Sequence, residues 1–132
     1  MKQYSFQRQK MQIPQENVYT GMSIMKDFDE FLKTHFKFPS NNLKKINDFI
    51  CEDQNMKTII NDLPTIISRE LSYNQISLDF MKETDPNEKI LEIVINSKLD
   101  EEKLLEKEDI ISDGIIDNYP KPQKEYIILV EP

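Results

Sequence analysis

The sequence is poor in the residues on which many recognisable enzyme motifs depend. It has one cysteine, one histidine, two glycines and no tryptophan. A single Cys51 excludes an internal disulfide framework, and with only His35 beside it a Cys/His zinc site cannot form within one chain. Two glycines, Gly21 and Gly114, are too few for a glycine-rich phosphate loop. We therefore expect no cofactor and no metal centre.

Long apolar runs and an excess of positive charge are also missing. No apolar run approaches the roughly 20 residues of a membrane-spanning helix, and the start, MKQYSFQRQKMQI, lacks the apolar core of a secretory signal. The net charge is −7. Nucleic acids and anionic membranes require a basic surface, so the charge disfavours both. We expect a cytoplasmic protein that binds neither of them directly.

What the sequence does have is acid concentrated in one half. Residues 1–75 hold ten Lys/Arg and nine Asp/Glu, a balance of +1, whereas residues 76–132 hold seven and fifteen, a balance of −8. The spacing of apolar residues also changes near this boundary. The two halves are therefore predicted to differ in structure as well as in charge.

The first half is predicted to be helical after a polar start. Residues 1–22 are rich in Gln and without sustained periodicity, which is typical of a flexible arm. Apolar residues then recur at helical spacing over 23–39, 40–53 and 55–71. Pro64 lies inside the last segment, where we expect a kink or two short helices that meet.

From residue 75 the apolar period becomes two. Residues 76–80 and 90–95 alternate apolar with other residues, which predicts two strands in an antiparallel hairpin, and 81–88 has turn composition. A helix over 101–117, capped by Asp100, and a β-branched strand over 124–131 follow.

These elements predict an α+β fold with a single domain over 23–132. Its helical part (23–72) packs on a small three-stranded antiparallel or mixed sheet, which together with the acidic helix occupies 75–131. We expect the last strand to cross over and lie beside the first, giving the strand order 2-1-3. The acidic helix would cover one face of the sheet and the N-terminal helices the other.

The acidic helix has two distinct sides. Leu104, Ile111 and Ile115 recur at core spacing, and we expect Leu105 and Ile116 to widen this stripe towards the sheet. A second stripe consists of five acids at spacings of three or four residues: Glu102, Glu106, Asp109, Asp113 and Asp117. Like charges four residues apart repel by a few tenths of a kcal/mol, so the stripe destabilises the helix with no local compensation.

Three interpretations of this acidic stripe are open. It is a solvated surface, a docking face for a basic partner, or a carboxylate site for Mg²⁺ or Ca²⁺. The metal interpretation is the weakest, because ligands on one helix face diverge and no calcium-binding loop is present. We take the five acids as the candidate partner-binding residues.

The other reactive side chains give no catalytic pattern. His35 falls in the apolar stripe of the first predicted helix, so we expect a packed, hydrogen-bonded histidine and no general base. Cys51 is expected to be a small buried hydrophobe. We predict that no activity depends on either residue and that the protein is not an enzyme.

The C-terminal run ISLDF…KILEIVINSKLDEEKLLEKEDIISDGIIDNYP…YIILVEP resembles a group of small bacterial proteins that end in strand, strand, acidic helix and strand. The resemblance covers about the last sixty residues and brings no catalytic residues. In size and acidity the chain also resembles the neutralising partners of toxin–antitoxin pairs. It implies an antitoxin-like or inhibitory module that covers a basic protein, such as a nuclease-like toxin. The alternative is a structural subunit held through apolar helix faces, with an enzyme as a distant third.

Overall fold

The computed structural model describes residues 21–82 and 87–132, with side chains from Asp27 onward. Residues 1–20 of the predicted arm, and 83–86 of the predicted turn, lie outside the described residues. Chain contacts divide the protein into two units, residues 1–30 and 31–132, at a boundary inside the first helix. The described elements are α1 (Gly21–His35), α2 (Leu43–Cys51), α3 (Gln54–Glu70), β1 (Tyr73–Phe80), β2 (Ile90–Ser97), α4 (Glu101–Asn118) and β3 (Glu125–Glu131).

Asp53 separates the second and third helices. Its carboxylate Oδ1 accepts hydrogen bonds from the backbone N–H groups of Asn55 and Met56, at 3.1 and 3.3 Å, which makes it the N-cap of α3. The helix then runs through Pro64 without a break, so two separate helices there are excluded. An apolar side with five buried residues anchors it: Met56, Ile59, Ile60, Leu63 and Ile67.

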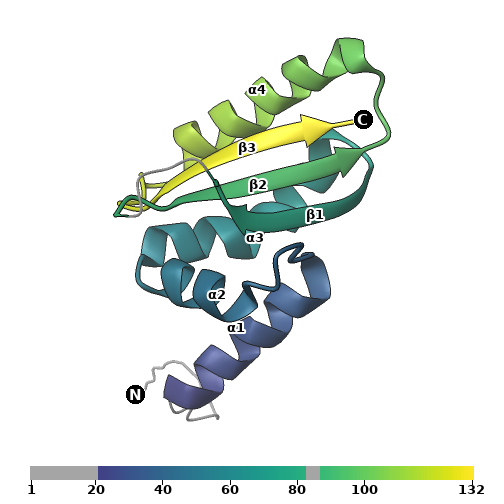
Figure 1. Ribbon diagram of the computed structural model, residues 1–132. Helices are drawn as coiled ribbons and strands as arrows, with labels where there is room; N and C mark the ends of the chain where they lie inside the picture. Colours follow the sequence, from purple (N-terminus) through teal and green to yellow (C-terminus); the bar gives the residue numbers. More distant parts are fainter. Residues whose placement is uncertain (1–20, 83–86) are drawn as a thin grey trace, which may run out of the picture. The chain divides into compact units, whose positions relative to one another are not determined.

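The predicted hairpin is confirmed, but the predicted strand order is wrong. β1 and β2 are antiparallel, with Ile76 opposite Ile95 and Leu78 opposite Ile93. β3 lies parallel to β2, and the strand order is β1-β2-β3 (Figure 1). A single helix, α4, thus joins two neighbouring parallel strands, which is the usual connection for a parallel pair. The α+β class with a small mixed sheet is confirmed.

The outer edge of β1, where we expected β3, pairs instead with the backbone of Lys37. The Lys37 N–H donates to the Ile76 carbonyl at 2.8 Å, and the Lys37 carbonyl accepts from the Leu78 N–H at 2.9 Å. These two bonds use the backbone groups that a third strand would need. Periodicity along β1 and β3 reports which face is buried and carries no information about which strand is the neighbour.

Helices α3 and α4 lie on the same face of the sheet (Figure 1). The side chains directed to that face are almost fully buried: Ile76, Leu78, Leu91, Ile93, Ile95, Ile128 and Val130. The alternate side chains on the opposite face are only half-buried and include Ser77, Asp79 and Glu92. The expectation that the acidic helix and the N-terminal helices cover opposite faces is therefore wrong for α3.

Candidate functional site

Helix α4 is fixed to the sheet by its inner side. Ile111 and Ile115 are each 1% exposed, and Leu104 is half-buried. The Glu108 carboxylate accepts a 3.0 Å hydrogen bond from the Val130 N–H, and this N–H points to the free edge of β3, away from β2. One residue of the acidic segment is therefore structural, since Glu108 satisfies a strand-edge donor. These contacts determine which side of α4 faces outward.

The outward side carries the five predicted acids. The structure brings all of them onto one face, opposite Ile111 and Ile115, and every one is exposed: Glu102, Glu106, Asp109, Asp113 and Asp117. Within residues 21–82 and 87–132, none of the five forms a hydrogen bond or an ion pair. Lys107, the nearest cation on the inner side, instead faces Glu70 at 3.9 Å. Their charge is thus uncompensated by local contacts.

Apolar side chains border the acidic face, and this corrects the prediction for two of them. Leu105 and Ile116, expected to face the sheet, are 70% and 68% exposed, and Ile110 is 40% exposed. Each residue of a helix is rotated by about 100° from its predecessor, so Leu105 points well away from the direction of Leu104. Leu105 and Ile116 lie on one flank of the acidic face and Ile110 on the other.

A groove separates α4 from α3 on the Ile110 side. Its volume is about 520 Å³, and residues of both helices line it, including Ile66, Arg69, Ile110, Ile111, Gly114 and Tyr119. Gly114 contributes no side chain to the groove, and a Cβ placed there would meet no atom within 4 Å. No sequence pattern predicted this groove. The available signal was a glycine in the middle of a helical segment, where it costs about 1 kcal/mol relative to alanine.

Both ends of this groove are held by polar contacts. The Tyr119 hydroxyl donates to Asp62 Oδ2 at 2.7 Å, and this hydrogen bond raises the pKa of Tyr119. The contact between Lys107 and Glu70 spans the two helices nearer the start of α4. Polar contacts therefore connect α3 and α4 near both ends of the groove.

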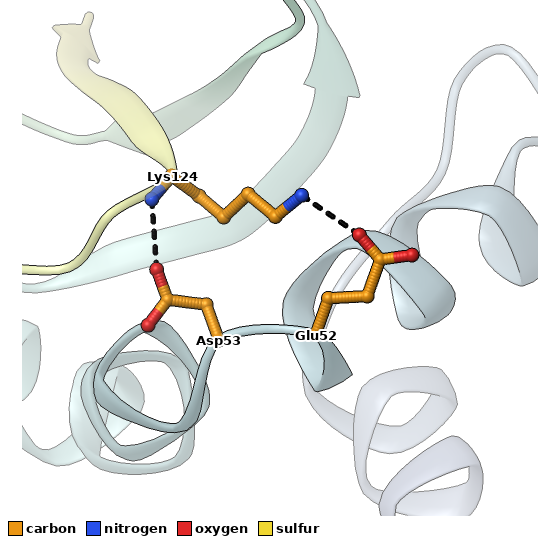
Figure 2. Close-up of polar contacts among 3 residues, drawn as sticks. All are labelled: Glu52, Asp53 and Lys124. Carbon is orange, nitrogen blue, oxygen red and sulfur yellow. Dashed lines mark hydrogen bonds and ion pairs between the residues drawn. The ribbon is translucent and has the colours of Figure 1, made fainter.

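A second cleft, of about 470 Å³, lies where the strands begin and end, and its lining mixes both charges: Lys45, Asp48, Phe49, Glu52, Lys89 and Lys124 are among its residues. Lys124 is held at two points (Figure 2): its Nζ is 2.7 Å from Glu52 Oε1, and its backbone N–H donates to Asp53 Oδ2 at 2.7 Å. The Lys124 ammonium also lies 5.0 Å from the centre of the Phe49 ring. These contacts join α2 and α3 to the start of β3. Both the ammonium and the backbone N–H of Lys124 are therefore used within the fold.

Asp53 is the buried centre of this junction. Burial acts to raise its pKa, but backbone hydrogen bonds hold the pKa below its ordinary value, the donors being the N–H groups of Lys124, Met56, Gln123 and Asn55. A carboxylate that is already engaged by several donors is a structural group and a weak base. We assign Asp53 to the fold.

Cys51 and His35 are not paired with one another. The Cys51 thiol is half-buried and donates to Asn47 Oδ1 at 3.0 Å, so it is less buried than predicted. Burial raises its pKa, which keeps the thiol protonated at neutral pH. His35 is exposed, and its ring lies 4.6 Å from that of Phe31. The prediction of a packed histidine is therefore wrong, because the side chain is exposed and only its ring contact with Phe31 resembles packing.

In the described part of the chain, no group of three or more His, Cys, Asp or Glu side chains is placed to hold a metal ion. None of the helices in these ranges is both long and apolar enough to cross a membrane. Comparisons of the chain with protein-family models, curated proteins and solved structures give no match.

Proposed function

We propose that the protein is an acidic protein-binding module, and that the outer face of α4 covers a basic surface of its partner. The observation that carries the proposal is the combination on this face of five exposed, locally uncompensated carboxylates with exposed Leu105, Ile110 and Ile116. Single exposed apolar side chains are normal on a protein surface. What favours a binding surface here is that all three lie on one helix, along both borders of an acidic face whose charge is not compensated by local contacts.

The two components have different roles in binding. A field of one sign accelerates encounter with a cationic surface, and exposed ion pairs add little affinity of their own. Burying a Leu or Ile side chain contributes roughly 1.5 to 3 kcal/mol. In this proposal the five acids steer the partner to α4, and the apolar side chains beside them supply most of the contact energy.

The partner class follows from the charge. A basic active site or a nucleic-acid-binding groove presents the cationic surface that this face complements, so we propose an antitoxin-like or inhibitory role against a nuclease-like protein of the cytoplasm. The support is the similarity of size and acidity described above, together with the exposed face of α4.

The alternative role, a structural subunit held through the apolar faces of the N-terminal helices, has less support. Among the side chains that the structure describes, the large apolar ones that are exposed all lie on α4. The apolar sides of α2 and α3 are used within the fold, where Ile46, Ile50 and Ile60 have no exposure.

Affinity purification from the native host, with two charge variants as controls, tests the proposal. The first variant reverses three acids of the face, Glu106→Lys, Asp109→Lys and Asp113→Lys. The second reverses three exposed acids elsewhere, Asp48→Lys, Glu125→Lys and Glu131→Lys, and so has the same net charge. We expect a basic protein to be captured by the wild type and by the second variant and to be lost from the first, with unchanged circular dichroism. Equal capture by both variants would refute the assignment of the face.

A further inference from the structure

The groove between α3 and α4 has a shape and lining that the acidic face alone does not explain. Ile66 and Ile110 form apolar parts of its two walls, Ile111 lies between them, and Gly114 contributes no side chain. On α4 the lining of the groove runs from Ile110 to Tyr119. Nine helical steps at about 1.5 Å each give a length of roughly 14 Å, or about two and a half helical turns.

Acidic side chains of α4 lie next to this groove, outside its lining. Glu106, Asp113 and Asp117 lie four residues before and three and seven residues after Ile110, so they share its side of the helix. All three are exposed. The result is a groove with apolar side chains on both walls, with Arg69 and Glu70 at its α3 side and a row of negative charge beside its α4 side.

We propose that this groove receives an amphipathic helix of the partner, with an apolar ridge seated between α3 and α4 and with lysine or arginine side chains over Glu106, Asp113 and Asp117. The inference rests on the proposed function and specifies the partner's binding element. An apolar ridge with adjacent basic residues complements both the lining and the acids beside it, and helix-in-groove binding uses this arrangement.

The structure favours a helix over an added strand. Strand addition requires an open sheet edge. At the β1 edge the backbone of Lys37 already bonds to Ile76 and Leu78, and at the β3 edge Glu108 holds the Val130 N–H. A second copy of the chain is also disfavoured as the occupant, because its own acidic face would meet the acids beside the groove, and each chain carries a net charge of −7.

The test uses a synthetic probe and a variant that fills the groove. The probe is a fluorescent peptide of about 18 residues, with leucines repeating at i, i+3, i+4 and i+7, lysines beside them and alanines elsewhere to favour a helix. A scrambled peptide of the same composition is the control probe. Gly114→Leu places a side chain in the groove without altering charge. Asn61→Leu, at an exposed position of α3 that does not line the groove, is the matched control variant.

We expect the wild type and Asn61→Leu to bind the patterned peptide about tenfold or more tighter than the scrambled peptide, and Gly114→Leu to lose this difference. If Gly114→Leu lowers the helix content, Ile110→Asn serves in its place, because Ile110 is already 40% exposed. Changes in NMR chemical shift on addition of the patterned peptide should be largest at residues that line the groove.

Two results would overturn the groove assignment: equal affinity of the wild type for both peptides, or full affinity of a folded Gly114→Leu for the patterned peptide. The charge-reversed variant Glu106→Lys, Asp109→Lys, Asp113→Lys separates this failure from a failure of the proposed function. If it loses both peptides while Gly114→Leu keeps them, the acidic face binds cations without the groove. If it keeps both peptides, the acidic face also fails as the binding surface.

Discussion

Asp53 connects three parts of the chain through one carboxylate. Oδ1 accepts from two N–H groups at the start of α3, and Oδ2 accepts from the N–H of Lys124 ahead of β3. A neutral amide has only one acceptor oxygen, so asparagine can replace the cap or the contact with Lys124 but not both.

Different substitutions of Asp53 should therefore lower the free energy of unfolding by different amounts. We predict that Asp53→Ala lowers the free energy of unfolding by about 2 kcal/mol and that Asp53→Asn lowers it by less, since asparagine is a good N-cap. Urea unfolding measures both values. Asp48→Ala, at an exposed position of α2, is the control and should change stability by less than about 0.5 kcal/mol. Equal losses for Asp53→Ala and Asp53→Asn would argue against the two-oxygen role.

The same carboxylate predicts a pH dependence. The folded-state pKa of Asp53 is below its ordinary value, so its stabilising contribution is complete above the unfolded-state pKa, near about 3.9, and is lost as pH falls through the folded-state pKa. The stability difference between wild type and Asp53→Asn should be constant above about pH 5 and should shrink below about pH 4. A difference that grows on acidification contradicts this account.

Glu108 distinguishes structural acid from surface acid on α4. We predict that Glu108→Ala lowers the free energy of unfolding by about 1 to 2 kcal/mol and speeds hydrogen exchange at the Val130 amide, because that N–H loses its acceptor. Glu106→Ala, at an exposed neighbouring position, should change neither quantity appreciably. Unchanged exchange at Val130 in Glu108→Ala would show that the hydrogen bond does not protect the strand edge.

At the scale of the element, α3 contains a residue that opposes helix formation. Pro64 has no N–H to donate, so the carbonyl of buried Ile60 lacks its usual helical partner. We predict that Pro64→Ala raises the free energy of unfolding by about 1 to 3 kcal/mol. Pro120→Ala, in the exposed connection after α4, is the control and should not stabilise. Thermal unfolding compares the two, and a Pro64→Ala protein no more stable than wild type would mean that the proline is already accommodated.

The elements themselves were predictable, and their neighbours were only partly so. A change of apolar period from 3.6 to 2 located the helices and the hairpin, because each period reflects the local geometry of the backbone. The neighbour of β3 was not predictable, because apolar alternation gives the buried face of a strand and not its partner. The backbone pairing of Lys37 with β1 has no sequence pattern either. The direction of Leu105 and Ile116 was missed for a related reason: a stripe gives the buried side of a helix, while its width is set by the packing partner.

The candidate site was partly predictable too. Five acids at helical spacing predicted one continuous face, and the structure places all five on it. The groove could not be predicted, because it is formed by two helices whose separation depends on contacts such as that between Tyr119 and Asp62. The only sequence signal at that position was Gly114, a glycine in the middle of a predicted helix.

At the scale of the whole molecule, the net negative charge lies almost entirely in the second half of the chain. Residues 76–132 carry a balance of −8 and residues 1–75 a balance of +1. The sheet and α4 therefore carry nearly all of the negative field. A cationic partner approaching from solution is attracted to this part of the protein before contact, within a screening length of about 8 Å at physiological salt.

The most direct measurement of the central claim is the association rate constant with the captured partner, recorded by stopped flow over a series of ionic strengths. For the wild type the rate constant should fall steeply as salt increases, while the dissociation rate changes little. The variant Glu106→Lys, Asp109→Lys, Asp113→Lys should associate much more slowly at low salt and lose this steep dependence. Wild-type association rates with an unchanged salt dependence in that variant would contradict the account and leave the acidic face of α4 as a solvated surface.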